Sequence, residues 1–262
     1  MKNSWNVERY SQFLDLRTRP AKDLLSAIPD SFKPHKVYDL GCGPGNSTIL
    51  LKKRWPDAEI IGLDSSDEML ANAKANYPDI LFVNGDIADF TVSEKIDCIF
   101  ANASLQWLDH HEILIPNLLQ QLKVGGMFGF QMPNNFHSPS HQVTIHILQS
   151  NTKWQSLLIK LRYGVLREPL YNLSWYYDLL TKCSVKSLQI WETTYFQEMS
   201  DYPEIFDWVK ATGLRPVLSE MDAKNQDQFK KIYIQSIATK YPKQINNKIL
   251  LPFRRIFMVG NK

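Results

Sequence analysis

The fold is decided by the stretch Val37-Tyr38-Asp39-Leu40-Gly41-Cys42-Gly43-Pro44-Gly45-Asn46-Ser47-Thr48. An apolar run ends at an acid, a Gly-x-Gly-x-Gly turn follows, and a helix-like segment comes next. Glycines permit a tight turn and let a ligand come close to the backbone. The stretch therefore predicts a strand, a turn and a helix N-terminus that together bind a nucleotide-like ligand.

Asp39, two residues before Gly41, indicates which ligand this is. A carboxylate at this point would repel the pyrophosphate of NAD or FAD, whereas it would suit an ammonium group. S-adenosylmethionine (SAM) carries adenosine and a methionine ammonium, and it has no phosphate. The residues therefore favour SAM, and with it methyl transfer.

Outward from this turn, residues 36–133 alternate between strand-like and helix-like patterns. Such alternation with short connections predicts right-handed crossovers and a parallel sheet. We expect the helix at Glu112–Leu122 to be ended by Gly125-Gly126, and Ser66 to cap a helix. The expected strands are Lys36–Leu40, Glu59–Asp64, Ile80–Asn84, Ile96–Ala101 and Met127–Met132, and the other expected helices are Asn46–Trp55 and Ser66–Tyr77.

Past Pro133 the alternation stops, and helical patterns mix with two further strand-like runs at Ser187–Met199 and Pro252–Gly260. The simplest arrangement is a single α/β domain over 1–262, with a mostly parallel, Rossmann-like seven-stranded sheet whose last strand is antiparallel. Its core would comprise about 30–133, 184–199 and 252–262. A helical cap would come from 1–29, 134–183 and 200–251.

Ligands of open α/β sheets lie beyond the carboxyl ends of the strands, and polar residues gather there in this chain. Asp64 follows the glycine turn by the spacing at which an acid binds ribose hydroxyls, and Asp86 and Ile87 suit an adenine ring. The alternative is that these acids only cap helices or form turns. The predicted cofactor-binding residues are Asp39, Gly41, Cys42, Gly43, Asn46, Asp64, Ser65, Met69, Asp86, Ile87, Asn102, Ala103 and Ser104.

Composition narrows the class of protein further. The chain has 262 residues, a formal net charge of +3 and three cysteines. The charge is too small to indicate nucleic-acid binding, and there is no CxxC pair for a metal site. No apolar run is long enough to span a membrane. We expect a cytoplasmic enzyme with no disulfide, metal, membrane or nucleic-acid partner, and a monomer is favoured.

The motifs Asp39-Leu-Gly-Cys-Gly-Pro-Gly, Gly85-Asp86-Ile87 and Phe100–Leu108 resemble class I SAM-dependent methyltransferases. Further segments, Trp208–Pro216 and Ile249–Phe257, resemble the trans-aconitate 2-methyltransferase family, and this resemblance covers nearly the whole chain. It implies methyl transfer from SAM to a carboxylate of trans-aconitate, or of a close small polycarboxylate, giving a monomethyl ester and S-adenosylhomocysteine.

The implied chemistry needs no catalytic acid or base, because a carboxylate with a pKa near ~4 is already ionised at neutral pH. The protein must instead align the reactants and hold the substrate's other carboxylates, for which arginine is best suited. The candidate substrate residues are Trp107, His141, Arg167, Tyr177, Tyr195, Arg215 and Arg255.

Two alternatives remain open from the sequence. The chain could methylate another acid, such as a malonyl-thioester carrier or a fatty acid-like substrate, in which case a long apolar groove is expected. It could also bind SAM without turnover, because binding and catalysis share the same residues.

Overall fold

The computed structural model describes residues 18–158, 170–210 and 214–262. These residues divide into two compact units. The sheet unit contains the described residues up to Pro133, together with Asn172–Thr193 and Ile256–Lys262. The second unit contains the described residues of Asn134–Tyr171 and Thr194–Arg255. Contacts thus group residues 18–26 and 172–183 with the sheet, whereas the sequence-based division assigned them to the cap.

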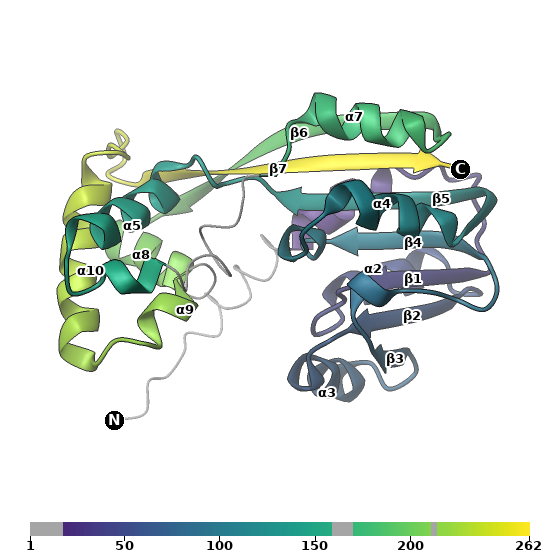
Figure 1. The fold of residues 1–262 in the computed structure, drawn as a ribbon, viewed down its shortest axis with the longest axis horizontal. Helices are drawn as coiled ribbons and strands as arrows, with labels where there is room; N and C mark the ends of the chain where they lie inside the picture. Colours follow the sequence, from purple (N-terminus) through teal and green to yellow (C-terminus); the bar gives the residue numbers. More distant parts are fainter. Residues whose placement is uncertain (1–17, 159–169, 211–213) are drawn as a thin grey trace. The chain divides into compact units, whose positions relative to one another are not determined.

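The described strands form a seven-stranded sheet in the order β3-β2-β1-β4-β5-β7-β6 (Figure 1). β1 pairs in parallel with β2 and β4, β2 with β3, and β4 with β5. The start of β5 meets the end of β7, since Gly125 N–H donates to Lys262 O and Lys262 N–H to Gly126 O. β7 is therefore antiparallel to β5, and the predicted mostly parallel sheet is confirmed. The strands are β1 (Lys36–Leu40), β2 (Glu59–Asp64), β3 (Leu81–Asn84), β4 (Ile96–Asn102), β5 (Leu122–Pro133), β6 (Lys186–Met199) and β7 (Ile249–Asn261).

Helices follow the strands of the sheet unit as the sequence pattern predicted. Residues 18–26 are helical before β1, and Ser66 caps α3 by accepting a hydrogen bond from Met69 N–H at 3.3 Å, as expected. Cys183 ends α7, and its side chain is partly exposed. The remaining elements of this unit are α2 (Asn46–Arg54), α3 (Asp67–Asn76), α4 (His111–Gln120), α7 (Leu173–Lys182) and the short 3-10 turns η1 (Ile87–Asp89) and η2 (Leu105–Trp107).

The predicted end of the helix before β5 was wrong. α4 ends at Gln120, and Gly125-Gly126 lie inside β5. The register moves from Ile96↔Leu122 to Cys98↔Met127, so β5 has extra residues against β4 at this point. A Cβ on Gly126 would lie 3.0 Å from Asp97 O. The glycine pair therefore serves a bulge in the strand rather than a helix terminus.

The second unit contains helices together with the end of β6 and the start of β7. α5 and α10 pack side by side, as Figure 1 shows. Tyr233 of α10 is fully buried and stacks near Phe229. Its hydroxyl donates to Ser140 O of α5 at 3.1 Å. The elements are α5 (Pro139–Ser150), η3 (Gln155–Leu157), α8 (Tyr202–Lys210), α9 (Arg215–Leu218) and α10 (Ala223–Ala238). Among the described residues, no helix is both long and apolar enough to cross a membrane.

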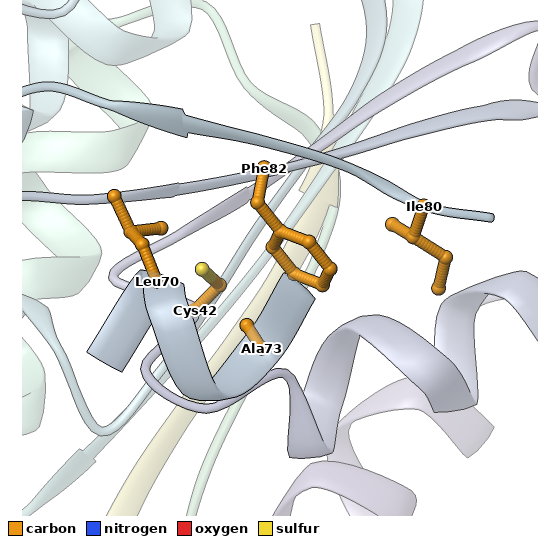
Figure 2. Close-up of a cluster of buried hydrophobic side chains, with 5 residues drawn as sticks. All are labelled: Cys42, Leu70, Ala73, Ile80 and Phe82. Carbon is orange, nitrogen blue, oxygen red and sulfur yellow. The ribbon is translucent and has the colours of Figure 1, made fainter. Parts of the chain in front are cut away.

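An apolar cluster lies directly beneath the glycine turn. Cys42 from the turn packs with Leu70 and Ala73 of α3 and with Ile80 and Phe82 at β3 (Figure 2). Burial raises the pKa of the Cys42 thiol well above its ordinary range. Burial of the Cys42 side chain in this cluster therefore stabilises the position of the turn through the hydrophobic effect.

Candidate cofactor and substrate site

The glycine turn joins β1 to α2 and needs glycine for two different reasons. Gly41 has φ +70, and a Cβ there would lie 2.3 Å from the Cβ of Ser104. Gly43 has φ +54, but a Cβ there would meet no protein atom within 4 Å. The N–H groups of Gly41 and Cys42 both donate to Leu63 O, at 2.7 and 3.0 Å. Gly41 is therefore closed in by protein, and Gly43 faces open space in which a ligand fits.

Asp39 lies under the turn with a side chain that is 0% exposed. Its Oδ2 accepts hydrogen bonds from Ser47 Oγ at 2.7 Å and Thr48 Oγ1 at 2.6 Å. Its Oδ1 is buried and has no hydrogen-bond partner among the described residues. Burial raises the pKa of this carboxyl from 3.8 to about 6, against the lowering effect of the two hydroxyls. Within the described ranges the carboxylate therefore keeps a free acceptor atom, which a positively charged ligand group would suit.

Ser47 and Thr48 were not predicted as site residues. The buried residues of α2 are Ser47, Thr48 and Leu51. The signal was present in the sequence, because two hydroxyl residues follow the glycine turn directly and can reach back to the preceding strand.

Asp64 ends β2 and organises the turn from the neighbouring strand. Its Oδ2 accepts from Gly43 N–H at 2.8 Å, and its Oδ1 accepts from Ser66 N–H at 2.9 Å. A carboxylate has about four acceptor positions, so two remain for other donors. Asp64 is half-buried, and its position fits the expected contact with two ribose hydroxyls.

The predicted adenine residues, Asp86 and Ile87, follow β3, and the other cofactor candidates described here follow β2 or begin α2. Asp86 is exposed, and its Oδ1 caps η1 by accepting from Ala88 N–H at 2.9 Å. Ile87 is buried, with its Cδ1 3.3 Å from the position of a Cβ on Gly41. Ser65 is exposed, and Met69 is an exposed side chain on the first turn of α3. Asn46 begins α2, next to the turn. The alternative that Asp86 caps a helix is thus confirmed for η1, and the capping hydrogen bond uses one of the two carboxylate oxygens.

The segment after β4 is packed onto the glycine turn. Ser104 Oγ donates to Leu40 O at 2.6 Å, and Ala103 N–H donates to Gln131 O at 2.9 Å. Ala103 adopts φ +55, which is unusual for a residue with a Cβ. Asn102 Oδ1 is buried and, in the part of the chain that the structure describes, has no hydrogen-bond partner. This segment therefore brings a second buried acceptor to the edge of the sheet that carries Asp39.

A buried histidine–tyrosine pair that the sequence did not predict holds the same segment. His111 Nε2 lies 2.9 Å from Leu105 O, and its Nδ1 lies 2.7 Å from the Tyr176 hydroxyl. A carbonyl only accepts, so Nε2 carries the proton and the Tyr176 hydroxyl donates to Nδ1. The pair links α7 to η2, and η2 carries Trp107, which is 48% exposed.

This edge of the sheet fits SAM. The two buried oxygens, Asp39 Oδ1 and Asn102 Oδ1, suit an ammonium group, which donates three hydrogen bonds and accepts none. Asp64 retains acceptor capacity for hydroxyls, and Gly43 leaves space for close approach. In the described residues, no group of three potential metal-ligating side chains gathers.

The predicted substrate residues fall in both units. Trp107 and Tyr177, which is 49% exposed, belong to the sheet unit. His141, Tyr195 and Arg255 belong to the second unit, where Tyr195 and Arg255 are buried and the Arg255 guanidinium lies 4.9 Å from the Phe253 ring centre. Arg167 lies outside the described residues, and for Arg215 the structure describes only the backbone at the start of α9. Their common role in substrate binding stays a prediction.

Comparison with known proteins gives the family. Residues 37–126 match the profile of a methyltransferase domain. The chain is 44% identical over 260 residues to "Trans-aconitate 2-methyltransferase" of Klebsiella pneumoniae (strain 342), covering 98% of both chains.

Two solved structures share the fold. One is the YcgJ protein from Bacillus subtilis, with a TM-score of 0.59 at 16% identity, covering 95% of this chain and 97% of that one. The other is phosphoethanolamine N-methyltransferase 2 of Haemonchus contortus in complex with S-adenosyl-L-methionine, with a TM-score of 0.56 at 14% identity, covering 93% of this chain and 52% of that one. Since the curated relative matches both units from end to end, the chain belongs to the trans-aconitate 2-methyltransferase family of SAM-dependent methyltransferases.

Proposed function

We propose that this protein transfers the methyl group of SAM to one carboxylate of trans-aconitate, giving a monomethyl ester and S-adenosylhomocysteine. The observation that carries the proposal is the 44% identity over 98% of both chains, which includes the second unit as well as the cofactor-binding sheet. A match limited to residues 37–126 would have supported only SAM binding.

Bound SAM supplies a methyl group on an activated sulfonium. The protein has to bind, orient and exclude water, because the accepting carboxylate is ionised at neutral pH without help from a base. Asp39 and Asn102 hold the ammonium, and Asp64 holds the ribose. We expect Trp107, which is exposed on η2, to contact the acceptor. Arg255 neutralises a carboxylate that does not react.

The nearest alternative is methylation of a different acid, either carrier-linked or fatty acid-like. The identity to the trans-aconitate 2-methyltransferase of Klebsiella pneumoniae (strain 342) favours a small polyanion, because it extends through the second unit as well as the cofactor edge. The non-catalytic alternative predicts SAM binding with no methyl ester formed from any acid.

The test is a panel assay with purified protein and SAM. The panel contains trans-aconitate, other small tricarboxylates, a monocarboxylate of similar size and a malonyl thioester. Release of S-adenosylhomocysteine and the mass of the ester are both recorded. We expect trans-aconitate to give the highest kcat/KM. Turnover of the thioester with none of the tricarboxylates would assign the protein to the alternative.

A further inference from the structure

The His111–Tyr176 pair joins two elements of the sheet unit that are far apart in sequence. His111 is the first residue of α4, and Tyr176 lies in α7. Their side chains are 3% and 0% exposed, and Tyr176 Oη lies 2.7 Å from His111 Nδ1. A hydrogen bond between two side chains this deeply buried is sensitive to the loss of either partner, because water cannot replace the missing group.

The pair acts on η2 through the backbone carbonyl of Leu105. His111 Nε2 lies 2.9 Å from Leu105 O, and Leu108 N–H donates to the same oxygen at 3.0 Å. Leu105 is fully buried, whereas Trp107, two residues later in the same turn, is 48% exposed. The histidine therefore helps to fix the backbone from which the Trp107 side chain extends.

The start of the same segment is held by other contacts. Ser104 Oγ donates to Leu40 O at 2.6 Å, and Ala103 N–H donates to Gln131 O at 2.9 Å. These bonds run to β1 and β5 and involve neither His111 nor Tyr176. Loss of the bond between the histidine and the tyrosine should therefore leave the cofactor edge in place and loosen η2 further along the chain.

We propose that Tyr176 and His111 are positioning residues for methyl transfer, which set the place of Trp107 beside the acceptor by holding the backbone of η2. The inference rests on the proposed function, in which Trp107 contacts the acceptor. Neither of the two buried side chains has to touch SAM or the acid. Alignment of reacting atoms is sensitive to displacements of about 1 Å, so a small movement of η2 lowers the rate of methyl transfer without changing the affinity for SAM.

Tyr176→Phe removes the hydroxyl and keeps the ring. We expect kcat for trans-aconitate to fall about tenfold or more, with the Kd of SAM changed less than about twofold. Tyr202→Phe is the matched control, because it removes a tyrosine hydroxyl that donates to Tyr241 O at 3.1 Å within the second unit. Equal losses of kcat in the two variants would overturn the proposal. So would a loss of SAM affinity in Tyr176→Phe as large as its loss of kcat.

A double-mutant cycle tests whether the two residues act as one chain. His111→Phe removes the donor to Leu105 O, and that oxygen keeps its hydrogen bond from Leu108 N–H. In the His111→Phe background, Tyr176→Phe should then cause no further loss of kcat. Independent losses that multiply in the double variant would overturn the proposal.

A readout at Trp107 does not depend on turnover. The seven tryptophans are replaced by fluorotryptophan, and the fluorine resonance of Trp107 is assigned by its absence in Trp107→Phe. With S-adenosylhomocysteine bound, we expect this resonance to shift or broaden in Tyr176→Phe and to stay in place in Tyr202→Phe.

The same measurement separates this proposal from the proposed function, and it decides the matter if His111→Phe does not fold. An unmoved Trp107 resonance in Tyr176→Phe would overturn the positioning role whatever the wild type methylates. A moved resonance with no turnover of trans-aconitate by the wild type would support the positioning of Trp107 and count against the proposed function alone.

Discussion

Both the cofactor edge of the sheet unit and the second unit contain buried polar side chains that are held by hydrogen bonds. The partners of these side chains differ in their distance along the sequence. At the cofactor edge, each acid is held by groups close to it in sequence or on the adjoining strand, as with Asp39 and Ser47. In the second unit, Asn135 is held by Arg254, which is 119 residues away in sequence. The difference teaches that the acids of the cofactor edge are held by local geometry, whereas the polar residues of the second unit are held by contacts between distant parts of the chain.

We expect the largest loss of SAM binding and stability from a substitution at Gly41, where the glycine turn packs against Ser104. Gly41→Ala would place a Cβ 2.3 Å from Ser104 Cβ and force alanine into φ +70. The left-handed conformation alone costs roughly 1–2 kcal/mol. We expect SAM binding to be lost and the melting temperature to fall, measured by calorimetry and thermal denaturation.

Gly43→Ala is the control for this change, because its Cβ meets no protein atom within 4 Å. It should bind SAM poorly but lose less stability than Gly41→Ala. Similar stability losses in the two variants would mean that the contact with Ser104 is not what makes Gly41 essential.

Arg255→Ala tests the second unit alone. Loss of a buried cation from a charged pair costs about 2–5 kcal/mol, so kcat/KM for trans-aconitate should fall by a factor of about 30 or more. The monocarboxylate should be affected far less, and SAM affinity should not change. Arg254→Ala removes an exposed guanidinium next to it and serves as the control. Equal losses on both substrates would show that Arg255 supports the fold and does not read the extra carboxylates.

Asp64→Ala tests the cofactor edge without a steric clash. The carboxylate holds two backbone N–H groups and is expected to bind the ribose, and hydrogen bonds to a charged group contribute roughly 1.5–3 kcal/mol each. SAM affinity should therefore fall about 10- to 100-fold in a folded protein. Asp57→Ala, an exposed acid before β2, is the control. Unchanged affinity in calorimetry would remove Asp64 from the site.

Asp39→Asn should change stability and SAM binding in opposite directions. Between pH 3.8 and about 6 the folded protein keeps a proton on Asp39 that the unfolded chain releases, so this group lowers stability as pH rises through that range. The variant should thus gain melting temperature over the wild type from pH 4 to 6 and keep that gain above pH 6. The upper limit is about 3 kcal/mol.

The same variant should bind SAM more weakly at pH 8, because the ammonium loses its anionic partner. A series of melting curves and SAM titrations from pH 4 to 8 measures both effects. A gain in stability that does not vary between pH 4 and 6 would contradict the raised pKa of Asp39 in the folded protein.

The sheet and its cofactor edge were predictable because their signals are local. β1 and β2 were predicted with their observed bounds, and Asp39, Asp64 and Asp86 each follow or end a strand as expected. The hydroxyls of Ser47 and Thr48 were missed because their hydrogen bonds to Asp39 reach back across the glycine turn from α2 to β1. The glycines of the β5 bulge were misread because Gly-Gly after a helical pattern also resembles a helix end.

The second unit was less predictable for a physical reason. Asn135 Oδ1 accepts a hydrogen bond from Arg254 N–H, 119 residues away in sequence, so this pairing exists only in the folded chain. No period or spacing in the sequence carries such information. The His111–Tyr176 pair, 65 residues apart, was hidden in the same way.

The burial of two of the three cysteines makes this protein suited to chemical labelling. Cys42 and Cys98 are buried, and burial raises the pKa of both thiols, so neither offers a reactive thiolate. Cys183, at the end of α7, is partly exposed, and its pKa is also raised by burial, so mildly alkaline conditions favour its modification. A fluorophore attached there would mark the sheet unit alone. Paired with a second dye on Lys224→Cys in α10, it would report the distance between the two units as SAM and a polycarboxylate bind.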